Sequence, residues 1–203
     1  MSNTSNTNND FLPTNYEIPS ADDGYFNIKK QTEGDYRFRI MGSPVLGNEF
    51  WITLGNEGGK PKKSPVRRRM NENIETSELE EGEEIHHFWA YVIWNYGAKK
   101  IQIMEITQKG IMQGIKGYTR KEKWGSPVGT NGYDIVVTKT GAGMETRYAV
   151  TVEPKEKLTP EIMKAYDTTT VNLEALFSND DPFKVGGEGK ELNIDNFDPD
   201  SMD

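Results

Sequence analysis

The sequence predicts a mainly β domain, a five-stranded barrel with one helix between strands 3 and 4 and short C-terminal helices. Two observations carry this prediction. A two-residue turn at Gly97-Ala98 splits the aromatic run at 88–106 into a hairpin, and helical spacing of apolar residues places a helix at about 107–119. Alternating apolar and polar residues mark further strands, at 35–40, 133–140 and 145–154. Five strands with a helix after the third is the plan of the OB-fold, a small, partly open barrel that binds oligonucleotides or oligosaccharides.

The first strand has one apolar and one basic face. In DYRFRI, three apolar residues alternate with Arg37 and Arg39, which is typical of a half-buried strand. The next run, NEFWITL at 48–54, is expected to be a second strand or a bent extension of the first.

The 203 residues suffice for one domain with tails. Residues 55–85 lack hydrophobic periodicity and are expected to form a long loop, first basic and then acidic. The remaining boundaries are a disordered leader at 1–23, the OB-fold domain at 24–157, a helical segment at 158–178 and a disordered acidic tail at 179–203.

Charge is distributed unevenly along the chain. The net charge of −8 by itself argues against nucleic acid, yet residues 25–69 hold ten bases and four acids. Residues 70–84 hold seven acids and no base, and residues 178–203 hold eight acids and two bases. Screening limits a charge to about 8–10 Å at physiological salt, so the local blocks predict binding better than the total does.

The sequence lacks the motifs that mark several classes of enzyme and metal-binding protein. With no cysteine, disulfides and thiolate metal sites are excluded, and the adjacent His86 and His87 point to opposite faces of a strand. No phosphate loop, nucleophile motif or zinc-protease motif occurs, and the acids inside predicted strands, such as Glu105 and Asp134, are a thin basis for catalysis. We expect a soluble, intracellular, non-enzymatic protein with no cofactor, no metal and no membrane contact; the oligomeric state is not indicated.

The aromatic hairpin offers two faces. The turn pairs Trp94 with Ile101 and Tyr91 with Met104, which places Trp89 and Tyr91 on a mixed face that is expected to point outward. Rings flanked by cations suit single-stranded nucleic acid, because each base can stack for about 1–3 kcal/mol and each phosphate attracts a cation. Two alternatives stay open. The C-terminal helices could cover this face, or a one-residue slip could expose Trp94 instead.

The basic stretch KPKKSPVRRR lies where an OB-fold places a loop that clamps nucleic acid, although a localisation signal or a solvated loop has the same composition. The expected stacking residues are Trp89 and Tyr91, with Trp51 and Trp94, and also Trp124, as further candidates. The expected phosphate contacts are Arg37, Arg39, Lys60, Lys62, Lys63, Arg67, Arg68, Arg69 and Lys100. The acidic run that follows is expected to fold over the basic stretch when no ligand is bound.

The acidic tail ends in NIDNFDPDSMD. It is either a solubilising segment or a partner-binding tail that also competes with DNA for the basic groove. The residues of the second interpretation are Asp195, Phe197, Asp198, Asp200 and Asp203.

Four phrases in order resemble the single-stranded DNA-binding proteins of tailed bacteriophages, over roughly residues 24–155. They are GDYRFRIMGSPVLGNEFW, FWAYVIWNYGAKKIQIMEITQKGI, KWGSP and YDIVVTKTGAGMETRYAVTVEP. The resemblance implies an OB-fold, sequence-independent binding of single-stranded DNA, and a role in phage replication, recombination and repair in the cytoplasm of the infected bacterial host. It also implies that the acidic tail recruits replication and recombination proteins. The tail departs from the bacterial type, which closes on an apolar residue, because the last aromatic here is Phe197.

The residues and the resemblance together predict a single-stranded DNA-binding protein. An RNA-binding OB-fold protein remains an alternative, because nothing in the sequence distinguishes binding of ribose from binding of deoxyribose. An acidic protein–protein adaptor is another, with its acidic segments mimicking nucleic acid and its sheet face covered.

Overall fold

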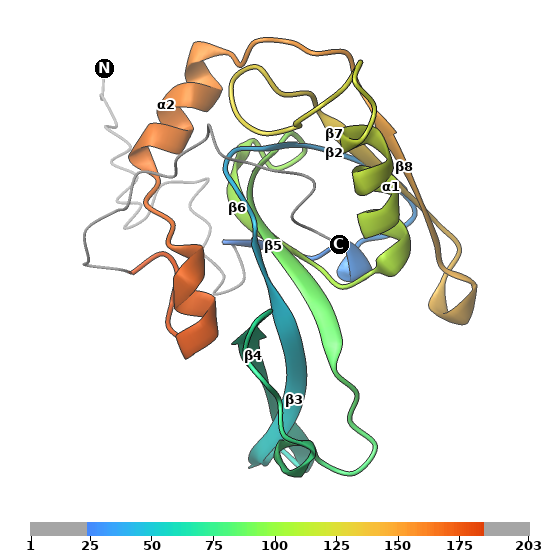
Figure 1. Ribbon diagram of the computed structural model, residues 1–203, viewed down its shortest axis with the longest axis vertical. Helices are drawn as coiled ribbons and strands as arrows, with labels where there is room; N and C mark the ends of the chain where they lie inside the picture. The colour runs from blue at the N-terminus through green and yellow to red at the C-terminus, as the bar shows by residue number, and fades with distance from the viewer. Residues whose placement is uncertain (1–23, 185–203) are drawn as a thin grey trace, which may run out of the picture.

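A computed structural model describes residues 24–184, and it is mainly β (Figure 1). The predicted leader at 1–23 lies outside the described residues, as do residues 185–203 of the predicted tail at 179–203. Residues 179–184 are described, and Phe183 packs against the core. The strands are β1 (Tyr25–Phe26), β2 (Gly34–Ile40), β3 (Val45–Glu57), β4 (Lys60–Arg69), β5 (His86–Asn95), β6 (Lys100–Ile106), β7 (Ile135–Thr140) and β8 (Arg147–Val152). The helices are α1 (Lys109–Thr119) and α2 (Pro160–Thr168), and 3₁₀ turns occur at Ile28–Lys30, Thr76–Glu78, Gly143–Glu145 and Leu173–Ser178.

The strands form one sheet in the order β1-β6-β5-β2-β7-β8, with β3 branching from β5 and β4 pairing with β3. The mainly β class is therefore confirmed, and α1 lies between β6 and β7 as predicted. The predicted barrel is not confirmed, because no pairing of β6 with β8 closes the sheet within residues 24–184.

The β5–β6 hairpin has the predicted register. Trp94 pairs with Ile101, Val92 with Ile103, and so on along the ladder. The Asn95 side-chain oxygen accepts hydrogen bonds from the backbone N–H groups of Gly97 and Ala98, at 2.9 and 3.3 Å. This Asx turn closes the hairpin and thereby fixes its register.

Helix α1 packs on the sheet through its apolar stripe, in which Ile111, Met112 and Ile115 are buried. Gly114 lets the helix approach β8 closely, because a Cβ at this position would lie 2.6 Å from a methyl group of Val150. The close approach explains why this segment is helical despite its internal glycines, because packing against the sheet compensates for its low helix propensity.

The predicted loop at 55–85 is wrong in its first part. Residues 45–69 form a long hairpin, the β3–β4 arm, whose outer part projects from the body (Figure 1). Gly58 and Gly59 have φ values of 60° and 80°, the left-handed conformation that a two-residue hairpin turn requires. A bulge between Thr53 and Gly55 interrupts the pairing once. The basic stretch is therefore a strand and not a loop.

Two apolar clusters lie on opposite faces of β5. One contains Trp89, Tyr91 and Ile93 and includes buried residues of α1. The other contains Phe88, Val92 and Trp94 beneath a C-terminal cover, defined here as residues 158–183. Figure 1 shows α1 and α2 on opposite sides of the β5–β6 hairpin. The cover contributes Leu158, Ile162, Leu173 and Leu176 to this cluster.

We expect the C-terminal cover to contribute substantially to stability. Ile162→Ala should lower the free energy of unfolding by about 2–5 kcal/mol, because it removes a buried side chain and leaves a cavity. Met163→Ala, one residue further along α2 and exposed, should change it by about 0.5 kcal/mol or less. Urea unfolding measures both. Equal losses would mean that the cover does not pack as described.

Candidate nucleic-acid interface

Trp89 and Tyr91 do not form a stacking platform. Their side chains are only 6% and 3% exposed and belong to the core cluster between the sheet and α1. The Trp89 indole N–H donates to Nε2 of His87 at 2.8 Å, and the Tyr91 ring stands edge-on to Trp89. Burial also raises the pKa of the Tyr91 hydroxyl. The predicted stacking role of these two residues is wrong, because neither ring has a face open to a nucleotide.

The opposite face of β5, which a one-residue slip would have turned outward, gives no stacking platform either. Trp94 is buried in the second cluster with Leu158 and Ile162 of the C-terminal cover. The predicted stacking role of Trp94 is therefore also wrong. The physical reason is that both faces of β5 are covered, one by α1 and the other by a segment that follows 63 residues or more later in the sequence.

Arg39 holds the fold together and is not available to phosphate. Its side chain is 1% exposed and is paired with Asp134, which precedes β7. Its guanidinium also donates to the backbone carbonyl oxygens of Glu156 at 3.2 Å and Gly129 at 3.4 Å. A buried guanidinium needs such partners, since the desolvation cost is otherwise large. The predicted phosphate contact at Arg39 is wrong.

Arg37 lies two residues earlier on the same face of β2 and is more accessible. Its Nε donates to Asp134 at 2.7 Å, and its guanidinium carbon lies 4.5 Å from the centre of the Tyr96 ring. The arginine side chain is 43% exposed, so it could still reach an anion. The turn residue Tyr96 is half-buried beside it.

The cations of β4 differ in how deeply their side chains are buried. Near the body, Arg67 is 10% exposed, contacts Glu49 at 3.4 Å and bonds to Glu105 at 2.6 Å. Burial raises the pKa of Glu49, against the opposing effect of Arg67. Arg67 is therefore a buried structural cation, contrary to the predicted phosphate role.

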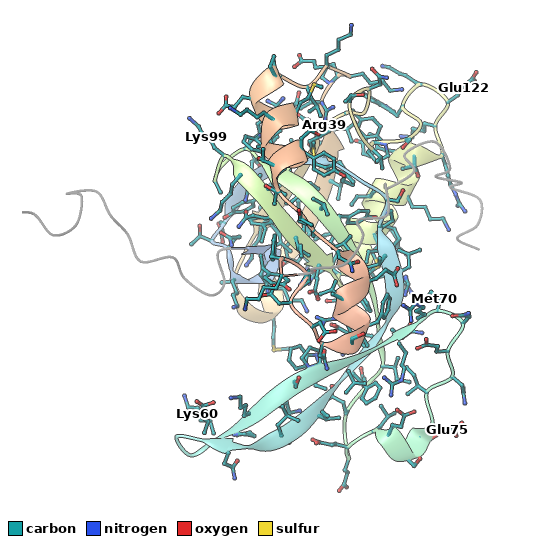
Figure 2. The ribbon with its side chains drawn as sticks, turned by 90° about the vertical axis from the view of Figure 1, so that its left-hand side faces the viewer. Arg39, Lys60, Met70, Glu75, Lys99 and Glu122 are labelled. Atoms are coloured by element: carbon teal, nitrogen blue, oxygen red, sulfur yellow. The ribbon has the colours of Figure 1, made fainter. Side chains whose placement is uncertain are left out.

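Most other cations of β4 have acidic partners, both at the base of the arm (Arg68, Arg69) and further out (Lys62, Lys63). Lys63 bonds to Glu83 at 3.0 Å and Arg68 to Glu78 at 2.8 Å. Three further predicted contacts lie along the same strand. Arg69 is paired with Glu72 and Glu174, Lys62 with Glu57, and Lys60 stands at the tip with no ionic partner among the described residues (Figure 2).

Residues 70–84, the acidic segment, fold back along the arm. Glu80 accepts hydrogen bonds from the backbone N–H and the hydroxyl of Thr53, and Glu83 accepts one from the backbone N–H of Trp51. These N–H groups belong to the edge of β3 beyond its pairing with β5, so the carboxylates occupy an otherwise open strand edge. The acidic run therefore contacts the basic stretch as expected, and its displacement by a ligand stays a prediction.

Trp51 is the one predicted stacking residue that lies on the arm. It pairs with Pro65 in the ladder, and Thr53 pairs with Lys63, so Trp51 and Lys63 share one face. Trp51 is half-buried. A partly exposed indole with an exposed cation on the same face was predicted for β5. The structure shows this arrangement on the β3–β4 arm instead.

The remaining predicted residues are placed as follows. Lys100 begins β6 opposite Asn95 and is half-buried. Trp124 is half-buried and packs against Tyr118 and Tyr133. The tail residues Asp195, Phe197, Asp198, Asp200 and Asp203 lie outside the described residues.

Sequence reasoning missed a second polar site around Lys139. In β7 the inward positions Ile135 and Val137 are followed by Lys139, which is buried. A lysine at an inward position of an alternating strand was the available signal, because buried lysines are rare unless they have a role.

Comparison with protein-family models, curated proteins and solved structures found no match. Within residues 24–184, no helix is long and apolar enough to cross a membrane. The same residues contain no group of three or more His, Asp or Glu side chains that could hold a metal ion.

Docking of the acidic segment should depend on pH. Hydrogen bonds from the Thr53 backbone and side chain lower the pKa of Glu80 below its ordinary value of 4.5. A carboxyl whose pKa is lower when folded stabilises the docked form above the ordinary pKa and loses this contribution as the pH falls through the folded pKa. The Thr53 and Trp51 amide resonances should therefore stay constant from pH 7 to about 5 and shift in stronger acid.

The matched variant is Glu80→Gln, which keeps an acceptor but does not titrate. It should abolish the acid-induced shift at Thr53. A wild-type Thr53 amide that does not respond to acid, or an unchanged response in the variant, would contradict the docking.

Proposed function

We propose that this chain is a non-enzymatic protein that binds single-stranded nucleic acid, DNA in the first place, through the β3–β4 arm. The observation that carries the proposal is the outer half of the arm, where a half-buried tryptophan shares a face with a lysine on a strand of exposed cations. Single strands need a ring for the bases and cations for the backbone, and this surface offers both without sequence readout.

The strand order supports the same assignment. The path β6-β5-β2-β7-β8, with α1 between β6 and β7, has the neighbour relations of an OB-fold whose barrel stays open. On this reading β3 extends the first strand and β5 is the second, so the arm stands where such folds carry a loop that clamps nucleic acid.

Electrostatics support the arm as a phosphate surface. Carboxylates of Glu78 and Glu83 lie within 3.0 Å of the Arg68 and Lys63 nitrogens, where phosphate oxygens would lie in a complex. These pairs are partly exposed, so each contributes at most about 1 kcal/mol and can be exchanged. A single strand would replace the acidic segment and release its own counterions.

We further propose the biological role that the phrase resemblance implies. The protein would protect single strands during phage replication, recombination and repair, in the cytoplasm of the infected host. The tail beyond the described residues would recruit replication proteins through its acids and Phe197.

Two observations favour a second candidate, a protein–protein adaptor. Both faces of β5–β6 are covered, and most of the predicted phosphate-binding cations already have acidic partners. Tryptophan fluorescence separates the two functions: a dT oligomer should quench Trp51 if the arm stacks on bases, and an adaptor would show no change. Matched rU oligomers report the preference for DNA over RNA.

Removing the outer cations should weaken binding and its salt dependence. For Lys60→Ala, Lys62→Ala and Lys63→Ala together, the slope of log affinity against log salt should fall by about 2, because each phosphate contact on a single strand contributes about 0.7. The control is the triple variant of Lys155, Lys157 and Lys164, which are exposed elsewhere and carry the same charge. An equal loss in both triple variants would contradict a site on the arm.

Neutralising the acidic segment should tighten binding at low salt. Glu78→Gln with Glu83→Gln should raise affinity for a dT oligomer about two- to tenfold beyond the control, because two surface pairs no longer compete. The control is Glu81→Gln with Glu84→Gln, which changes the net charge equally at two exposed positions of the same segment. If the two double variants bind equally, the acidic segment does not compete for the arm.

A further inference from the structure

A cleft of about 610 Å³ lies away from the tip of the arm, between the chain around residues 29–33, the start of α1 and the β7–β8 connection. Its lining includes Lys29, Gln108, Lys139 and Tyr148, together with one acidic residue, Glu33. The volume is within the range of about 300–1,000 Å³ that is usual for small-molecule sites. We call it the β7–β8 cleft.

Lys139 gives this cleft a buried positive charge. The side chain is 7% exposed, and its ammonium donates to the carbonyl oxygens of Lys29 at 2.7 Å and Gln31 at 2.6 Å. No carboxylate among the described residues is bonded to it. An ammonium has three N–H donors, so one is left for a ligand, and a buried cation without a counter-charge favours an anion.

Gln108 adds an acceptor that has no partner. Its Oε1 is buried without a hydrogen bond among the described residues, and its Nε2 donates only weakly, at 3.4 Å, to Thr107. Buried polar atoms nearly always have partners, so this acceptor can take a hydrogen bond from a donor outside the chain. The residue also precedes α1, whose first turn has no side-chain cap and presents its positive end here.

Tyr148 supplies a flat ring. It pairs with Lys139 in the β7–β8 ladder, so the phenol and the ammonium share one face of the hairpin. Burial raises the pKa of its hydroxyl above the ordinary value. Thr32 and Thr146 line the same space.

We propose that the β7–β8 cleft binds one nucleotide of a single strand, with its phosphate at Lys139, its base against Tyr148 and a base N–H group at Gln108. Inorganic phosphate would satisfy only the ammonium. A nucleotide combines the anion, the flat ring and the donor that the three side chains call for. The ligand class rests on the proposed function, whereas the site does not include any residue of the arm.

The test uses thymidine 5′-monophosphate as the probe and backbone amide resonances of the full chain as the readout. Added nucleotide should shift the amides of Gly141, Gly143 and Thr146 around the cleft. Gln108→Leu should weaken this binding about three- to tenfold and leave the melting temperature unchanged or raised, since it removes a buried unpaired acceptor. Gln113→Leu, the same change at an exposed position of α1, should leave nucleotide affinity unchanged.

The outcomes separate the cleft from the arm. Cleft amides that do not respond to the nucleotide would overturn the site, whatever a dT oligomer does to the arm amides of Gly55 and Gly58. Equal affinity for inorganic phosphate and nucleotide, with no effect of Gln108→Leu, would reduce the site to an anion site and overturn the nucleotide assignment. Shifts in the cleft without shifts in the arm would retain the cleft and overturn the proposed function on the arm.

Discussion

Burial of β5 on both faces is the constraint on which the rest of the structure depends. The strand carries large apolar side chains at nearly every position from Phe88 to Trp94, so no single layer can cover it. One side is closed by α1 and the other by the C-terminal cover. The two layers hold the fold together, and they also remove every ring from Phe88 to Trp94 from contact with a ligand. Any binding surface must therefore lie elsewhere, on the arm and at the β7–β8 cleft.

The chain neutralises much of its own positive charge. Near the body, Arg39 and Arg67 are buried with carboxylates and keep strands in place. At Lys63 and Arg68 the partners come from the acidic segment, and these contacts are partly exposed and exchangeable. The burial of each side chain thus separates the cations that hold strands in place from those that a phosphate can reach. A net charge of −8 is compatible with nucleic-acid binding when the acids lie next to the cations they compete for.

The sequence predicted local structure better than exposure. The register of β5–β6 followed from the turn at Gly97-Ala98, and α1 begins and ends within two residues of its expected bounds. Exposure of Trp89 was wrongly predicted, because the covering residues lie far away in sequence; the unbroken apolar run was the signal of double burial. The arm was missed because the sequence of β4 does not alternate between apolar and polar residues, which is the usual signal of a strand. The Gly58-Gly59 pair is nevertheless a hairpin signal.

The central claim is that single strands meet the arm while the aromatic strand stays closed. Photocross-linking of the protein to a dT oligomer that carries 5-iodouracil, followed by mass spectrometry of the peptides, tests it most directly. The account predicts cross-links in the peptide that contains Trp51, within residues 45–69. Cross-links at Trp89, Tyr91 or Trp94 would contradict it, because they would require the core or the C-terminal cover to open and β5 to serve as the binding face.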